Sequence, residues 1–169
     1  MDVGISILKN FLIMKIKLLY IGKEDSAEIS PAVQNYVNKI KFYVPFEVEA
    51  IPYLKNTKLA VEEQKKQEGL LFLKKIESSD FVVLLDEHGK EMTSVAFSQF
   101  LQQQMVRGTK RLVFLIGGAY GFSESIYERG NYKISLSQMT FPHILTRLIF
   151  SEQLYRAMTI LKGEPYHHV

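Results

Sequence analysis

The sequence of 169 residues contains no cysteine, and this absence excludes several kinds of chemistry at once. Disulfides, thiolate nucleophiles, cysteine-ligated zinc and iron–sulfur clusters all require a thiol. A chain without cysteine fits a reducing compartment, so we expect a cytoplasmic protein. The four histidines form no H-E-x-x-H motif, and only His167 and His168 are neighbours, so we expect no metal site.

The chain also lacks a membrane-spanning run and a strong charge of one sign. Residues 1–13 are apolar but too short to cross a bilayer, and they have no positive n-region or small-residue cleavage site. Met14 opens a segment that is typical of a new strand. We therefore expect residues 1–13 to be an N-terminal extension, residues 14–169 to be one domain, and no membrane partner. The net charge of +3 permits RNA binding without predicting it.

What the sequence does contain is an alternation of strand and helix patterns. Two continuous apolar runs, 81–85 and 112–116, are typical of strands buried on both faces, whereas residues 87–90 predict a turn. Such alternation predicts an α/β fold with a mainly parallel sheet and helices on both faces. The expected strands are 15–21, 46–50, 81–85, 112–116 and 132–136, and the expected helices are 30–40, 58–76, 94–105, a short one from 123, and 142–162.

Ligands in parallel sheets bind beyond the carboxyl ends of the strands, which directs attention to the loops after Leu85, Ile116 and Leu136. The second of these loops, 117–121, has three glycines in five residues, and glycine permits close backbone approach to a ligand. It is neither a phosphate-binding P-loop nor a dinucleotide fingerprint, because its spacing is G-G-x-x-G and no acidic residue follows ~20 positions later. A ligand site and a plain turn both remain open from these residues alone.

The third loop leads into a helix that carries two candidate functional side chains. His143 and Arg147 are four residues apart and share a helix face, where they can bind an anionic group or can be an ordinary capping histidine and a surface arginine. The last residues, from Tyr166 onward, are expected to form a free tail. The alternative for the tail is that its phenol and imidazoles fold over a pocket.

Five motifs occur in order and together form a specific pattern. They are Leu-Asp-Glu-His-Gly-Lys at 85–90, Ile-Gly-Gly-Ala-Tyr-Gly at 116–121, Ser-Gln-Met-Thr-Phe-Pro-His at 137–143, Glu-Gln-Leu-Tyr-Arg-Ala at 152–157 and Gly-Glu-Pro-Tyr-His-His at 163–168. With the start at Met14, the chain over residues 14–169 resembles the bacterial ribosomal RNA large subunit methyltransferase H family of SPOUT methyltransferases. The resemblance implies a SPOUT-type fold with a C-terminal trefoil knot and a homodimer. It also implies methyl transfer from S-adenosylmethionine to N3 of a pseudouridine in helix 69 of 23S rRNA within the assembled ribosome.

The resemblance further implies two groups of site residues. The cofactor-binding positions are Leu85, Gly117, Leu136, Ser137, Gln138, Met139, Thr140 and Phe141. The catalytic or substrate-side positions are His143, Arg147, Tyr166, His167 and His168. A histidine can serve as the base for the N3 proton, or Arg147 can stabilise the imide anion, and the sequence does not choose between them. Ala119, Gln138 and Ile144 depart from the family's usual residues.

Three other functions remain as alternatives. One is a related knotted methyltransferase that acts on tRNA, and a second is a non-catalytic ribosome-binding factor that keeps the fold. The third, a nicotinamide-dependent oxidoreductase, is opposed by the glycine spacing and by the missing acidic residue.

Overall fold

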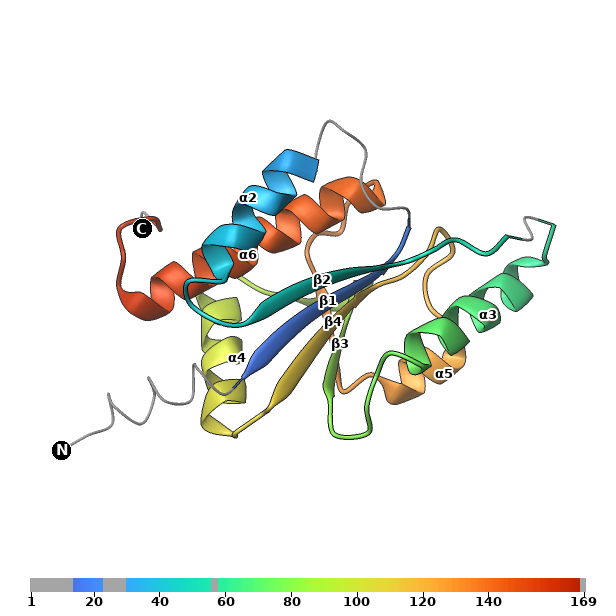
Figure 1. Ribbon diagram of the computed structural model, residues 1–169, viewed down its shortest axis with the longest axis horizontal. Helices are drawn as coiled ribbons and strands as arrows, with labels where there is room; N and C mark the ends of the chain where they lie inside the picture. Colours follow the sequence, from blue (N-terminus) through green and yellow to red (C-terminus); the bar gives the residue numbers. More distant parts are fainter. Residues whose placement is uncertain (1–13, 23–29, 56–57, 168–169) are drawn as a thin grey trace.

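The computed structural model describes residues 14–22, 30–55 and 58–167, and its centre is one five-stranded sheet (Figure 1). The strand order is β2-β1-β4-β3-β5, and all pairings between these strands are parallel. The strands are β1 (Lys15–Ile21), β2 (Phe46–Ile51), β3 (Phe81–Glu91), β4 (Arg111–Ile116) and β5 (Tyr132–Ser135). The predicted α/β class with a mainly parallel sheet is thus confirmed. The extension 1–13 lies outside the described residues.

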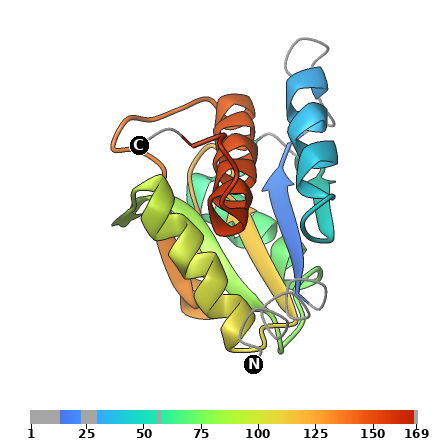
Figure 2. The same ribbon diagram turned by 90° about the vertical axis from the view of Figure 1, so that its left-hand side faces the viewer.

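Helices cover both faces of the sheet, as predicted. The described helices are α2 (Ser30–Ile40), α3 (Val61–Leu73), α4 (Ser94–Val106), α5 (Glu124–Arg129) and α6 (His143–Lys162). Helices α2, α4 and α6 pack on one face over the larger hydrophobic cluster, and α3 and α5 pack on the other (Figures 1 and 2). No helix in the described ranges is both long enough and apolar enough to cross a membrane.

The helix ends follow from local chemistry. Thr93 caps α4, since its hydroxyl accepts a 3.1 Å hydrogen bond from the backbone N–H of Ala96. Gly163 ends α6 in the left-handed conformation, with φ of 68°. Helix α3 is shorter than the predicted range 58–76, since it begins at Val61 and ends at Leu73. No side-chain hydrogen bond caps its first turn. Residues 56 and 57, which precede the predicted start at residue 58 and could cap the helix, lie outside the described residues.

Strand β3 differs from the prediction at its end. Residues 87–90 do not form a separate turn, because β3 continues to Glu91. After a register shift beyond Leu85, Lys90 pairs with Ile134 and Glu91 pairs with Ser135 of β5. Gly89 permits this second stretch of pairing, since a methyl group there would lie 2.6 Å from the carbonyl carbon of Ile134.

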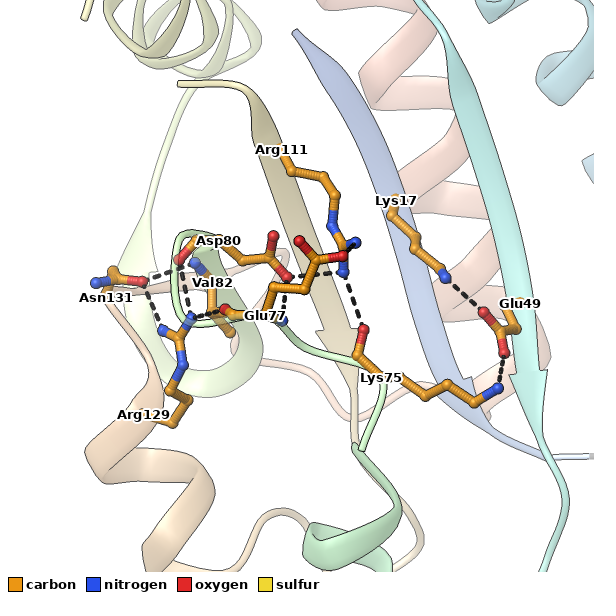
Figure 3. A network of polar contacts seen from close by, with 9 residues as sticks. All are labelled: Lys17, Glu49, Lys75, Glu77, Asp80, Val82, Arg111, Arg129 and Asn131. Atoms are coloured by element: carbon orange, nitrogen blue, oxygen red, sulfur yellow. Dashed lines mark hydrogen bonds and ion pairs between the residues drawn. The ribbon is translucent and has the colours of Figure 1, made fainter. Parts of the chain in front are cut away.

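The amino-terminal edge of the sheet is held by a network of polar contacts (Figure 3). Arg111 donates hydrogen bonds to Oδ2 of Asp80 at 2.8 Å and to the carbonyl of Lys75 at 2.9 Å, and it also pairs with Glu77. Arg129 donates to the carbonyls of Glu77 and Asp80 at 2.8 and 2.9 Å. The Asp80 side chain is fully buried, so its charge depends on this network. The opposite, carboxyl-terminal edge carries the candidate site.

Candidate functional site

A cavity of about 480 Å³ lies at the carboxyl-terminal edge of the sheet. It is formed by all three loops that the sequence singled out, those following Leu85, Ile116 and Leu136. The first turn of α6 closes it with His143 and Thr146. A cavity of this size lies within the range of small-molecule sites, roughly 300–1,000 Å³. The structure therefore places the candidate loops around one common space.

The glycine-rich loop forms a tight turn in the cavity wall. The N–H of Gly121 donates a 3.0 Å hydrogen bond to the carbonyl of Gly118, and these two residues also form an isolated β-bridge. Gly121 has φ of 76°, which a residue with a side chain rarely adopts. A side chain at position 117 would have its first carbon 3.1 Å from the backbone of Gly121. At Gly117, Gly118 and Gly121 the cavity wall consequently consists of backbone without side chains, which leaves space for a ligand.

The third loop, residues 136–141, contributes most of the predicted cofactor positions. The hydroxyl of Ser137 accepts a 2.9 Å hydrogen bond from the N–H of Met139, which fixes the loop locally. Every predicted cofactor position lines the cavity except Gln138. Its amide instead donates to Oε2 of Glu91 at 3.3 Å, at the end of β3. Gln138 therefore lies outside the cavity wall and braces the loop.

His143 and Arg147 lie near each other on α6 but in different surroundings. His143 is half-buried and lines the cavity. Its pKa is lowered, first by burial and then by the positive charge of Arg147, while the carboxylate of Glu68 partly opposes both effects. Arg147 is buried, with 6% exposure, and its guanidinium lies 4.1 Å from the ring centre of Tyr20. The alternative of a surface arginine is thus wrong.

The described residues of the tail, Tyr166 and His167, do not line the cavity of their own chain. The ring of Tyr166 packs 4.7 Å from that of Tyr155, and its hydroxyl donates to Oε1 of Glu152 at 3.2 Å. Burial, followed by the hydrogen bond between its hydroxyl and that of Tyr36, raises the pKa of Tyr166 above its usual range. Tyr166 is therefore not a free tail residue. It lies beyond the far end of the 20-residue helix that begins at His143, which is roughly 30 Å at 1.5 Å per residue. His167 follows it, and His168 lies outside the described residues.

The sequence reasoning missed two residues that meet in the cavity wall. The hydroxyl of Tyr127 donates a 2.6 Å hydrogen bond to Oδ2 of Asp86. Burial, together with the Asp86 carboxylate, raises the pKa of Tyr127 to about 12. Asp86 follows the buried run 81–85 directly, so its position was a usable signal. The sequence around Tyr127 carries no such signal, because only long-range packing brings α5 to the carboxyl-terminal edge of the sheet.

Potential metal ligands do not gather within the described residues, where no group of three His, Cys, Asp or Glu side chains lies close enough to hold an ion. The cavity combines bare backbone, apolar side chains such as Leu85 and Phe141, and a few polar groups. This mixture is suited to an organic ligand with a flat ring and polar substituents.

Comparison with known proteins agrees with this architecture. The family model described as "Predicted SPOUT methyltransferase" matches residues 14–167. Ribosomal RNA large subunit methyltransferase H of Christiangramia forsetii is 54% identical over 156 residues, which cover 92% of this chain and 99% of the relative. The proteins of the same name from Parabacteroides distasonis and Bacteroides thetaiotaomicron are 54% and 51% identical with the same coverage. The chain therefore belongs to the SPOUT methyltransferases and, within them, to the ribosomal RNA large subunit methyltransferase H family.

A solved structure also matches, but more weakly. It is the SpoU methyltransferase AviRb from Streptomyces viridochromogenes in complex with the cofactor AdoMet. The match has a TM-score of 0.45 at 13% identity, and it covers 93% of this chain and 62% of that chain.

Proposed function

We propose that this chain transfers a methyl group from S-adenosylmethionine to N3 of a pseudouridine in helix 69 of 23S rRNA. We further propose that it works in the cytoplasm on assembled ribosomes, as a homodimer whose C-terminal region forms a trefoil knot. One observation carries the proposal: a chain of this family has a cavity at the carboxyl edge of its sheet, and all but one of the positions that the family resemblance assigns to the cofactor line it.

The residues around the cavity suit S-adenosylmethionine. Gly117 offers backbone without a side chain, and Leu85, Leu136 and Phe141 offer apolar surface for an adenine ring. Ser137, Met139 and Thr140 complete that side of the cavity, and their loop can contact a ligand through its N–H and C=O groups. When it is bound, the cofactor supplies an electrophilic methyl group, so the protein itself needs chiefly to position the acceptor.

His143 is placed to take the proton that N3 must lose. Its lowered pKa keeps the imidazole neutral at pH 7, and a neutral imidazole nitrogen can accept a proton. Arg147, which stacks on Tyr20, carries the charge that favours the neutral imidazole of His143 and that would stabilise negative charge on the base being methylated. Positioning of the reactants can supply roughly 7–11 kcal/mol of the barrier reduction, and a general base adds ~10²–10⁴-fold.

The homodimer explains how the tail can take part in the reaction. Within one subunit, Tyr166 and His167 lie at the far end of α6 from His143. An antiparallel partner would bring its own tail to this cavity, so each site would combine His143 and Arg147 of one subunit with Tyr166, His167 and His168 of the other. The net charge of only +3 predicts weak, salt-sensitive binding to free RNA, which favours a structured ribosomal substrate.

Transfer of labelled methyl to ribosomes that lack the modification tests this proposal. The ribosomal RNA is digested with nuclease, and the product nucleoside is identified. We expect label in N3-methylpseudouridine from helix 69, and a His143→Ala variant should slow the transfer. Label in bulk tRNA instead would favour the related knotted enzyme, and binding of S-adenosylmethionine without transfer to either RNA would favour a non-catalytic ribosome-binding factor. Either result would overturn the proposed substrate.

A further inference from the structure

Glu68 on α3 is a buried acidic residue with an incomplete set of partners. It is only 3% exposed. One carboxylate oxygen, Oε1, accepts a 2.9 Å hydrogen bond from the amide of Gln64. The other oxygen, Oε2, is buried without a hydrogen-bond partner, and no basic side chain of the described residues forms an ion pair with it. Buried charges are normally paired, and the described residues give this oxygen no such partner.

The unpartnered oxygen lies directly behind the glycine turn of the cavity. Oε2 of Glu68 occupies the place that a side chain at position 118 would need, and Gly118 itself lines the cavity. The next residue of α3, Gly69, packs equally tightly against Ser123, which precedes α5 two residues after the turn. Only the thickness of a glycine backbone therefore separates the carboxylate from the ligand space, and a wall this thin screens charge poorly.

The field of Glu68 reaches the substrate side of the cavity. His143 lines the cavity from α6, on the opposite face of the sheet from α3, yet the Glu68 carboxylate acts on its pKa in the direction that favours positive charge. Any cation held between the glycine turn and His143 would be stabilised in the same way. If S-adenosylmethionine binds with its methyl group toward a base held beside His143, the sulfur that carries this methyl group would lie in this region.

We propose that Glu68 is the buried counter-charge for the sulfonium of S-adenosylmethionine, acting through the bare backbone of Gly118. The inference rests on the proposed function and adds a residue that the family resemblance did not assign. Glu68 is thus a positioning residue that selects the charged, methyl-bearing cofactor over its neutral product. It would also promote exchange after transfer, since S-adenosylhomocysteine lacks the positive sulfur that the carboxylate favours.

Affinity for the two forms of the cofactor provides the test. Binding of S-adenosylmethionine and of S-adenosylhomocysteine is measured by calorimetry for the wild-type protein, Glu68→Gln and Glu62→Gln. Glu62 is on the same helix, and its side chain is 83% exposed, so this variant controls for loss of one negative charge. We expect Glu68→Gln to weaken S-adenosylmethionine binding on the order of tenfold and to change S-adenosylhomocysteine binding less than about twofold. Glu62→Gln should change neither.

Thermal unfolding without ligand separates this role from a structural one. Glu68→Gln removes an uncompensated buried charge, so the ligand-free variant should melt at the wild-type temperature or above it. A lower melting temperature, or equal loss of affinity for both ligands, would show that Glu68 merely supports the turn and would overturn the inference. An unchanged preference between the ligands would do the same. Failure of the wild-type protein to bind either ligand would instead remove the proposed function, and this inference with it.

Discussion

The guanidinium of Arg147 stacks 4.1 Å from the ring centre of Tyr20, and this contact joins the first turns of α6 to the carboxyl end of β1. The arginine is buried there, one helical turn from His143. Its charge is therefore fixed close to the imidazole, which explains why the pKa of His143 is lowered by Arg147 as well as by burial. Arg147 therefore favours the neutral form of His143 although Arg147 itself does not line the cavity.

Removing the two charges near His143 should move its pKa in opposite directions. Arg147→Gln removes the charge that lowers the pKa and should raise it, whereas Glu68→Gln removes the opposing charge and should lower it further. NMR titration of the imidazole carbon-bound protons gives both values, with His143→Gln to assign the resonance. Shifts in the same direction would contradict this electrostatic account.

The lowered pKa of His143 also makes folding stability depend on pH. In the unfolded chain the imidazole takes up a proton near its usual pKa of 6.5, while the folded protein resists protonation until a lower pH. The unfolded state thus binds more protons in this interval, so stability is complete above pH 6.5 and declines as the pH falls toward the folded-state pKa. Urea unfolding between pH 7.5 and 5 should show a steeper decline for the wild-type protein than for His143→Gln. Parallel curves would indicate that His143 titrates normally.

Gly89→Ala should weaken the attachment of β5 to β3. The added methyl group would lie 2.6 Å from the carbonyl carbon of Ile134 and 2.7 Å from its nitrogen, and backbone cannot move aside as a side chain can. We expect a loss of about 1–3 kcal/mol in the free energy of unfolding. The exposed neighbour provides a control, because Lys90→Ala keeps the backbone path and should change stability by less than ~0.5 kcal/mol. Equal stability of the two variants would argue against the second stretch of β3–β5 pairing.

Arg111→Ala should destabilise the protein without weakening cofactor binding. The substitution leaves the fully buried Asp80 carboxylate without its ion-pair partner, which costs about 3 kcal/mol. Lys110→Ala removes an exposed positive charge next to it and should have little effect. Chemical denaturation gives the stability. Calorimetry should give an unchanged S-adenosylmethionine affinity, because this network lies at the amino-terminal ends of β3 and β4 and the cavity lies at their carboxyl-terminal side. Reduced affinity in a folded variant would contradict that separation.

Deletion of residues 166–169 should reduce turnover far more than cofactor binding. Tyr166 packs against the end of α6 remote from the cavity of its own subunit, so the cofactor affinity should stay within about twofold, while methyl transfer falls ~100-fold or more if the tail supplies a catalytic group. Mixing this truncated chain with full-length His143→Ala tests the dimer directly. A mixed dimer that joins an intact His143 to an intact tail should recover activity, and absence of recovery would contradict a site shared between subunits.

The sequence predicted the parts of the molecule that depend on local pattern. The buried strands at 81–85 and 112–116 and the helices at 94–105 and 142–162 could be predicted because periodicity and helix-end signals are local properties. The continuation of β3 was not readable, since residues 87–90 have the composition of a turn and become strand only by pairing with β5.

The candidate site shows the same division between local and long-range information. The three loops were predicted because the carboxyl ends of parallel strands meet at one edge. The stacking of Arg147 on Tyr20, the bond from Tyr127 to Asp86 and the position of Glu68 behind Gly118 all join distant segments. No pattern within one segment indicates them. Tyr166 likewise was expected to be free. Its contact with the ring of Tyr155 depends on how the chain turns back after α6, and no local pattern indicates that turn.

The polar network at the amino edge of the sheet has a consequence for how such a chain can vary. Ion pairs that fix the strands sit at one edge, and the loops that form the cavity wall sit at the other. Exchange of a cavity-loop side chain such as Ala119 therefore leaves the anchoring charges untouched. A substitution in the cavity wall can thus change what the site binds without removing the ion pairs that hold the other end of the sheet.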